Sequence, residues 1–180
     1  MPTGGLESSP TGDATSAAAR LLRVVVSYAG PLISLGRLDL IGLLCELYAE
    51  VLVPEVVIEE CLARPGNADT LRIRQALDAG RLAPCFPPGT ALVGLGPGAS
   101  AAIVHAMSLN AAMLLDERAG RQHAQALGLN VSGTLGVLVR ARQQGLVGPL
   151  APLIAAQRAS GQRLGQAVVS ALAAVGERAE

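Results

Sequence analysis

The sequence predicts a three-layer α-β-α domain built on a central, mostly parallel sheet. Short runs of residues that are apolar throughout alternate with longer segments in which apolar residues recur at a helical period. Strands that lack a polar face are typical of parallel sheets, because helices cover both of their faces. At 180 residues, the chain has room for one domain with a sizeable core and for tails, but not for two domains of ordinary size.

The first half of the chain supplies strands and helices in alternation. LLRVVVS (21–27) is a β-branched apolar run of strand length, and the small residues of YAGP end it. We expect a helix over 38–49, where apolar side chains fall on one face, and a second strand over 51–54. Pro54 then begins a helix, since the first helical turn tolerates proline. A further helix is expected over 67–80, with an Asn or Asp start and a Gly stop.

The second half continues the same alternation after APCFPPGT, which we interpret as a Pro-rich connection. The expected elements are a helix over 97–109, a strand over 111–115, a helix over 117–128, a short strand in NVSG, a helix starting at Thr134, and helices in PLAPLIAAQRASG and RLGQAVVSALAAVG. The domain prediction is a disordered tail over 1–20, the α/β domain over 21–148, and a helical pair over 149–180 that packs on the same domain.

Composition limits the classes of function. All 14 basic residues are arginines, and the formal net charge is zero, so the whole chain exerts no electrostatic pull on nucleic acid. Aromatic residues make up only 2% of the chain, which argues against an extended surface for stacking bases. Half of the residues are hydrophobic, more than a lone domain of this size usually buries, so self-association as a homodimer is expected.

The cysteines and the N-terminus predict a cytoplasmic protein. Cys45, Cys61 and Cys85 are odd in number and share no CxxC-type spacing, which indicates apolar thiols in a reducing compartment. The first residues carry no basic region before an apolar run, unlike a secretory signal. No apolar run reaches the roughly 18 residues of a membrane span, so no membrane association is expected.

Acidic residues follow the predicted strands, where the ligand crevice of a parallel sheet lies. Glu60 lies in the helix after the second strand, and Asp116 and Glu117 follow the strand over 111–115. Carboxylate oxygens are the protein ligands that Mg²⁺ prefers, and such an ion stabilises the charge that develops on a phosphodiester. Asp116 and Glu60 are therefore candidate metal ligands.

Four segments, taken in order, resemble the PIN-domain nucleases: VVVSYAGPLISLGRLDLIGLL, VLVPEVVIEECL, LGPGASAAI and AAMLLDERAGRQHAQALGLNVSGTLGVLVRARQQGLV. The chain is most similar to a bacterial and archaeal branch of unassigned function, akin to the toxin ribonucleases of toxin–antitoxin pairs. The resemblance spans roughly residues 22 to 176. It implies a fold that gathers several acids around Mg²⁺ or Mn²⁺ and hydrolyses single-stranded RNA.

Carried over residue by residue, the resemblance makes Glu60 and Asp116 metal ligands and Glu117 a secondary one. The other positions where the family has acids hold Tyr28 and Ala99 here. A tyrosine hydroxyl is almost entirely protonated at neutral pH, so Tyr28 cannot replace an anionic oxygen ligand. The expected function is therefore that of the metal-dependent ribonuclease lineage with activity reduced or lost.

The lineage also suggests partners: RNA, with Arg118 and Arg121 as phosphate contacts, and an antitoxin-like protein. These two arginines also fit an exposed polar helix face. Asp116 also fits a cap at the start of the helix that follows it.

Three other functions stay open. The first is an active toxin-like endoribonuclease in which Glu60, Asp116 and Glu117 hold one weak ion. The second is dinucleotide binding, because Gly94, Gly96 and Ala99 fit G-x-G-x-x-A. The third is an interaction module that buries its excess apolar surface in a partner protein.

Overall fold

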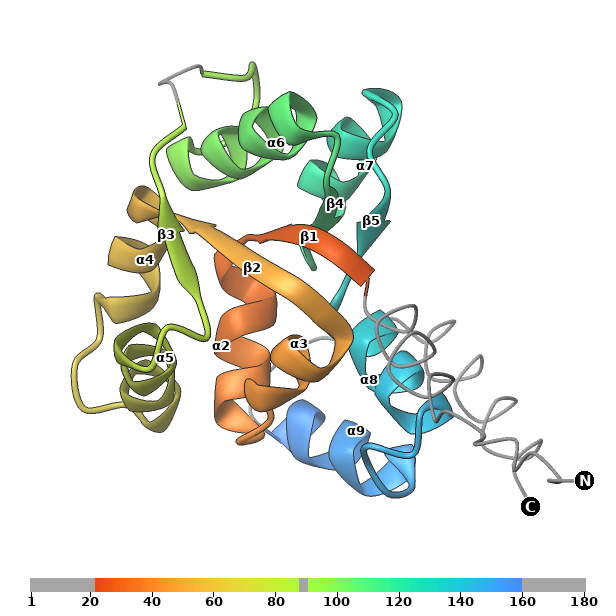
Figure 1. Cartoon of the computed structure of the whole chain (residues 1–180). Helices are drawn as coiled ribbons and strands as arrows, with labels where there is room; N and C mark the ends of the chain where they lie inside the picture. Colours follow the sequence, from red (N-terminus) through yellow and green to blue (C-terminus); the bar gives the residue numbers. More distant parts are fainter. Residues whose placement is uncertain (1–21, 88–90, 160–180) are drawn as a thin grey trace, which may run out of the picture.

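The computed structural model describes residues 22–87 and 91–159 (Figure 1). The expected N-terminal tail over 1–20 and the expected helix in RLGQAVVSALAAVG lie outside these residues. The first helix of the expected C-terminal pair is present as α9 (Leu150–Ala159).

The described residues form one five-stranded sheet in which every neighbouring pair of strands is parallel. The strands are β1 (Leu22–Ser27), β2 (Tyr48–Pro54), β3 (Ala83–Cys85), β4 (Ala112–Leu114) and β5 (Val131–Ser132). Their order across the sheet is β3-β2-β1-β4-β5, so β1 is central. The predicted parallel sheet is therefore confirmed.

Helices cover both faces of the sheet (Figure 1), which confirms the three-layer prediction. The helices are α2 (Ala29–Arg37), α3 (Gly42–Leu47), α4 (Glu55–Leu62), α5 (Ala68–Asp78), α6 (Pro97–Leu109), α7 (Arg118–Ala126), α8 (Thr134–Gln143) and α9. Of these, α6 and α7 pack on one face, and α2, α3 and α8 pack on the other with α9 outside them. No helix among the described residues is both long and apolar enough to cross a membrane.

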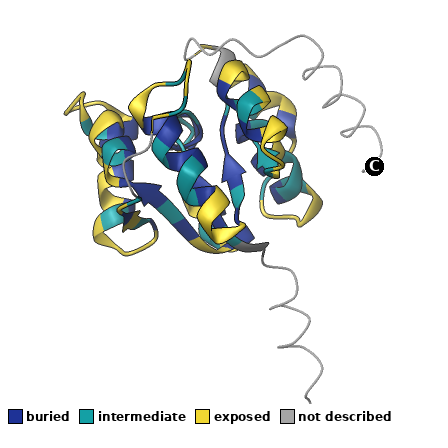
Figure 2. Ribbon diagram, turned by 90° about the horizontal axis from the view of Figure 1, so that it is seen from above, coloured by how far each residue is buried: buried dark blue, intermediate teal, exposed yellow. Residues whose placement is uncertain are grey.

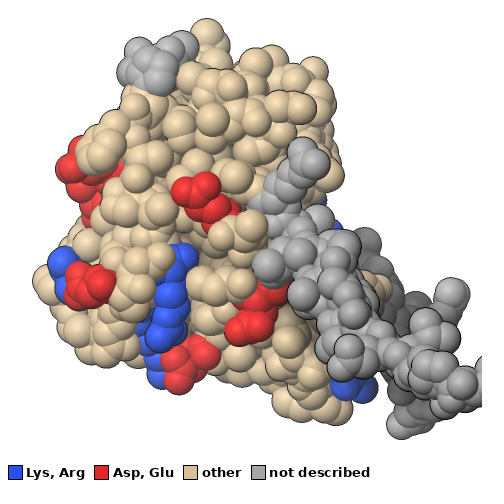
Figure 3. Space-filling model, viewed as in Figure 1, with Lys and Arg blue, Asp and Glu red and all other residues tan. Residues whose placement is uncertain are grey.

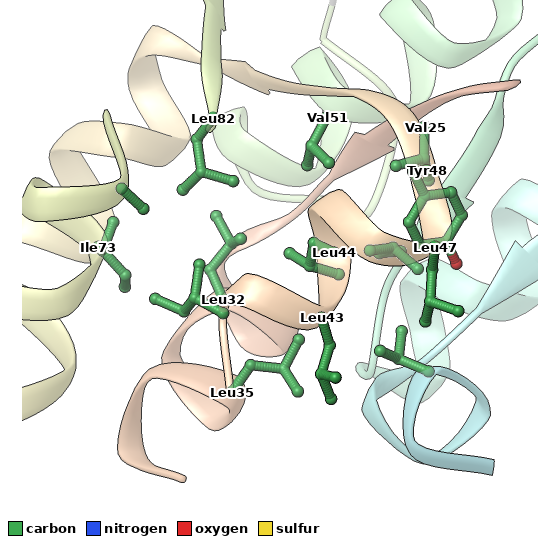
Figure 4. Packing of buried hydrophobic residues seen from close by; sticks show 14 of the residues in the cluster. Val25, Leu32, Leu35, Leu43, Leu44, Leu47, Tyr48, Val51, Ile73 and Leu82 are labelled. Atoms are coloured by element: carbon green, nitrogen blue, oxygen red, sulfur yellow. The ribbon is translucent and has the colours of Figure 1, made fainter. Parts of the chain in front are cut away.

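The core has two parts because the central strand buries side chains on both faces. Val25 belongs to the larger cluster and its neighbour Val26 to the smaller one, and both are fully buried. Figure 4 shows the larger cluster, where leucines of α2 and α3, such as Leu32 and Leu44, meet Ile73 of α5 under the sheet. Figure 2 shows the resulting pattern, with buried strands in the middle and exposed residues on the outer sides of the helices.

One prediction for residues 28–50 was wrong, and one helix there was not predicted. β1 ends at Ser27 as expected, and α2 begins at Ala29 with Pro31 in its first turn. The single helix expected over 38–49 is shorter, covering only Gly42–Leu47, and Tyr48 already belongs to β2. Asp39 adopts a left-handed backbone with φ 60°, which separates α2 from α3. The apolar residues of the short helix α3 and of the strand β2 that follows it have the spacing of one longer helix, which explains the wrong prediction.

The Pro-rich connection also contains a strand that the sequence did not predict. Ala83–Cys85 forms β3, and its Pro84 lies opposite Val53 of β2. Proline cannot donate to a strand ladder, so it is tolerated where one side of the strand has no neighbour. β3 is such an edge strand, which explains why Pro84 fits here.

Helices α2 and α5 cross closely at Gly36. A Cβ at this position would lie 3.0 Å from Cβ and 3.1 Å from Cα of Asp69. Arg72 of α5 holds the crossing, because its Nη1 donates to the Gly36 carbonyl at 2.8 Å and its Nε lies 2.8 Å from Oδ1 of Asp39. The absence of a side chain at Gly36 lets the two backbones approach.

We predict that Gly36→Ala lowers the free energy of unfolding by about 1–3 kcal/mol, because the backbone of α5 must shift to admit a methyl group. The matched control is Gly42→Ala at the start of α3, where nothing lies within 4 Å of the added Cβ. This control is expected to be neutral or stabilising by up to about 1 kcal/mol. Urea denaturation of both variants checks the difference, and equal stabilities would contradict it.

Candidate functional site

The carboxyl ends of β1, β4 and β5 meet at one edge of the sheet. Ser27 pairs with Leu114, and Leu114 pairs with Ser132. The chain beyond these strands stays aligned, since the Tyr28 N–H donates to the Leu114 carbonyl at 2.9 Å. Tyr28, Asp116 and Thr134 therefore follow neighbouring strand ends, in the crevice where parallel sheets bind ligands.

Tyr28 links the end of β1 to α4 and α6. Its hydroxyl donates to Oε1 of Glu60 at 3.1 Å. On α6, a Cβ at Gly98 would lie 3.1 Å from Oε2 of Glu60, 3.1 Å from Cε2 of Tyr28, and 3.4 Å from Cγ2 of Val57. Residues 28, 60 and 98, distant in the chain, therefore converge.

Gly98 was not a candidate in the sequence analysis. The available signal was a glycine directly after the proline that begins a helix, in LGPG. Its neighbour Ala99, where the resemblance predicts an acid, is buried, with only 2% of its surface exposed.

The environment keeps the Tyr28 hydroxyl protonated. Burial, followed by the charge of Glu60, raises the pKa of Tyr28 to about 12, and the hydrogen bond to Glu60 and the charge of Glu117 add to the shift. At neutral pH, the side chain is therefore a neutral donor to a carboxylate. Tyr28 supplies a hydrogen bond at a position where the resemblance predicts an anionic ligand.

Both carboxylate oxygens of Asp116 accept hydrogen bonds from Thr134. Oδ1 accepts the backbone N–H of Thr134 at 2.7 Å, and Oδ2 accepts the Thr134 hydroxyl at 2.6 Å. Thr134 is the first residue of α8, so Asp116 satisfies a free N–H group of that helix. Asp116 therefore acts as a helix cap, as the alternative interpretation predicted. The helix that it caps is α8, however, and not the predicted α7.

Glycines on two sides leave room for the Asp116 side chain. A Cβ at Gly133 would lie 2.6 Å from Oδ1 of Asp116 and 2.9 Å from Nη1 of Arg121, so no other residue fits without a shift. A Cβ at Gly30 would lie 3.4 Å from Cβ of Asp116. Because Gly30 is two residues from Tyr28, the surroundings of Asp116 and of Tyr28 are continuous.

The remaining predicted site residues lie at the start of α7. Glu117 is exposed and occupies the position just before the helix, where its side chain makes no capping hydrogen bond. Arg118 is exposed, whereas Nη1 of Arg121 donates to the Leu115 carbonyl at 2.9 Å. Arg121 thus has a structural role at the end of β4. Contact of either arginine with a phosphate stays a prediction.

The present residues do not fit a carboxylate metal centre as they stand. Glu60 accepts a bond from a neutral hydroxyl, and both oxygens of Asp116 face donors of Thr134. Across residues 22–87 and 91–159, no group of three or more His, Cys, Asp or Glu side chains is placed to hold an ion. Metal binding by Glu60, Asp116 and Glu117 therefore stays a prediction of the resemblance.

The dinucleotide alternative lacks its first strand. A G-x-G-x-x-A turn must follow a strand directly, but residues 91–96, which contain Gly94 and Gly96, form turns and irregular backbone. The nearest preceding strand in the described part of the chain is β3, which ends at Cys85.

The chain belongs to the PIN-domain family, whose model matches residues 24–177. Among solved structures, the chain is similar to a PilT N-terminus domain protein from the hyperthermophilic archaeon Sulfolobus solfataricus P2. The two share 20% sequence identity with a TM-score of 0.46, over 65% of this chain and 91% of that chain. No curated protein matches the sequence. The family assignment made from the order of the motifs is therefore confirmed.

We predict that Asp116→Asn lowers the free energy of unfolding by about 1–3 kcal/mol, because an amide offers one acceptor oxygen to the two donors of Thr134. The measurement is urea denaturation in the presence of a chelator, so that no metal contributes. Glu117→Gln is the control, with an expected change within about 0.5 kcal/mol. A full-stability Asp116→Asn protein would show that the cap contributes nothing.

A second prediction concerns the titration of Tyr28, followed as the difference in phenolate absorbance between the parent and Tyr28→Phe. The midpoint is expected near pH 12 instead of 10.0. Because the pKa is higher in the folded state, this contribution to stability is complete below about pH 10 and is lost as the pH rises toward about 12. Glu60→Gln should lower the midpoint only in part, since burial is the larger cause. A midpoint at the ordinary value in a folded protein would contradict the described contact.

Proposed function

We propose that this chain is a PIN domain of the metal-dependent ribonuclease lineage in which hydrolysis of RNA phosphodiesters is reduced or lost. One observation carries the proposal: the Tyr28 hydroxyl donates to Glu60 at 3.1 Å, at a position where the resemblance predicts an acid. Glu60 is therefore held by a hydrogen bond from a neutral donor, whereas in an active relative it would share a cation.

The second acid supports the same proposal. Asp116 retains the expected place after β4, but its carboxylate is bound by the start of α8. Such a bond stabilises the fold with or without a metal, which gives a physical reason for the aspartate to persist where catalysis has been lost. Loss of activity then requires no loss of the domain.

The distribution of charge on the surface also supports weak binding of RNA. On the face shown in Figure 3, basic side chains lie in the lower half among acidic ones, and the upper part, over α6, is uncharged. With zero formal net charge, the chain offers no general attraction to phosphate. Three predictions of the lineage and composition stay predictions. They are RNA as a ligand, an antitoxin-like protein and a second copy of the chain as partners, and a cytoplasmic location.

An active toxin-like endoribonuclease is the second candidate. The observation in its favour is that Glu60 and Glu117 are both exposed and that the charge of each raises the pKa of Tyr28. A movement of the Tyr28 ring away from Glu60 would free that carboxylate for an ion. Direct measurement of cleavage separates the two candidates.

The test is RNA cleavage in Mg²⁺ and in Mn²⁺ by the parent, Asp116→Asn, Tyr28→Phe, Tyr28→Asp, and the double variant Tyr28→Asp with Ala99→Glu. We expect cleavage at or near background for the parent and a gain of roughly tenfold or more for the double variant, because two anionic oxygens are restored. Tyr28→Phe breaks the bond to Glu60 without adding an acid, so it should gain nothing.

Two readouts guard this test against misfolding, since Ala99 is buried. Circular dichroism checks each fold, and the single variant Tyr28→Asp is expected to gain a rise in melting temperature with Mn²⁺ that the parent lacks. Cleavage by the parent that disappears in Asp116→Asn would overturn the proposal in favour of the active enzyme. A folded double variant that neither binds metal nor cleaves would also count against it.

A further inference from the structure

A cavity of about 560 Å³ opens beside the candidate site, beyond the carboxyl ends of β2 and β3. Pro54 and Cys85, which pair in register at those strand ends, form its floor. The first turns of α4 and α6 form its sides. Its volume falls within the range of about 300–1,000 Å³ that is typical of small-molecule sites.

Apolar side chains make up most of the wall, and few polar groups face the cavity. Ser100 is buried, and its Oγ accepts the backbone N–H of Leu92 at 3.1 Å, which fastens the preceding loop to α6. Burial raises the pKa of the Cys85 thiol to about 11, so the thiol is neutral. Glu55 contributes the one carboxylate among the described lining residues.

Phe86, the only phenylalanine in the sequence, lines this cavity and is 74% exposed. Most large apolar side chains of the domain lie in the core, whereas this ring stands at the rim beside Pro87, with Pro97 also lining the cavity. An exposed aromatic face next to an apolar cavity is suited to stacking a planar ring.

The charge of the cavity selects among planar ligands. The described lining residues include no lysine or arginine, and Glu55 is exposed in the first turn of α4. That carboxylate already complements the amino end of α4, so a ligand anion at this place would meet a like charge. A neutral ring that carries N–H donors fits better, because a carboxylate accepts two parallel hydrogen bonds.

The cavity and the candidate site share two helices. On α4, Glu55 and Val56 face the cavity, and Glu60 meets Tyr28. On α6, Pro97 and Ser100 face the cavity, and Gly98 lies against Glu60 and Tyr28. A chain of nucleotides in the crevice could therefore place one base in the cavity while its backbone passes the acids.

We propose that this cavity binds one unstacked guanine base of single-stranded RNA, with the ring against Phe86 and its two adjacent N–H donors on the carboxylate of Glu55. Among the common bases, guanine is the one whose Watson–Crick edge carries two neighbouring donors that match the two oxygens of a carboxylate. Proteins that read unpaired bases combine stacking with bonds to this edge. The inference rests on the proposed RNA lineage, but it requires no cleavage.

The test uses the full chain and free nucleosides, which carry no phosphate and so report on the cavity alone. Guanosine is titrated into the protein by calorimetry, with inosine, which lacks the exocyclic amine, as the matched probe and uridine as a second. We expect saturable guanosine binding, with inosine weaker by roughly tenfold for the lost hydrogen bond to a charged group. No saturable binding of guanosine would overturn the proposal.

Variants tie the binding to the named residues. Glu55→Gln should remove the preference for guanosine over inosine, and Phe86→Leu should weaken all nucleosides by roughly tenfold, as loss of a stacking ring does. Glu59→Gln, an exposed acid on the same helix that does not line the cavity, should bind as the parent does. Guanosine binding that is unchanged in both Glu55→Gln and Phe86→Leu would place the ligand elsewhere and overturn the proposal.

This outcome is separable from that of the cleavage test. If the double variant cleaves RNA but the parent binds no nucleoside, the proposed lineage stands and the guanine site falls. If the parent binds guanosine as expected and the double variant remains inactive, the guanine site stands and the account of the lost activity falls.

Discussion

Burial of the central strand on both faces is the constraint on which this structure depends. Val25 and Val26 point to opposite sides of β1 and are both inaccessible to solvent, so the strand must be covered by helices above and below. Parallel pairing with β2 and β4 follows, because connections through helices bring each next strand back in the same direction. That arrangement gathers the carboxyl ends of the strands at one edge and so creates the crevice that holds Tyr28 and Asp116.

Within that crevice, polar groups that a nuclease would use for a metal are engaged with the protein itself. Glu60 accepts the Tyr28 hydroxyl, and Asp116 accepts both donors of Thr134. Asp116 is partly buried and serves the start of α8, whereas Glu60 is exposed on α4, and each acid makes its hydrogen bonds without a cation. In the described residues these two acids are therefore engaged within the fold, and an apolar cavity adjoins them.

Much of the fold was predictable because its signals are local. A few neighbouring residues were enough to predict the strand over 21–27, the helix over 97–109 and the helix end before Gly128. The structure has β1, α6 and the end of α7 at these places. The predictions failed where a local pattern had two solutions. Helix α3 passes directly into β2 with no glycine or proline at the junction, and Pro84 fits a strand only because β3 has one neighbour. The order of strands, which decides the second case, is a property of the whole sheet.

The sequence by itself determined the layered α/β architecture and the PIN-domain family, since both depend on residue identity and spacing. The resemblance also predicts that Tyr28 and Ala99 stand where acids are expected. Only the tertiary structure decided what the remaining acids do. Asp116 caps α8 instead of α7, the Tyr28 hydroxyl donates to Glu60, and Gly98 leaves room for both side chains of the Tyr28–Glu60 pair. All three features depend on contacts between residues far apart in the chain. Such contacts are fixed by how helices pack on the sheet, and spacing along the sequence carries no record of them.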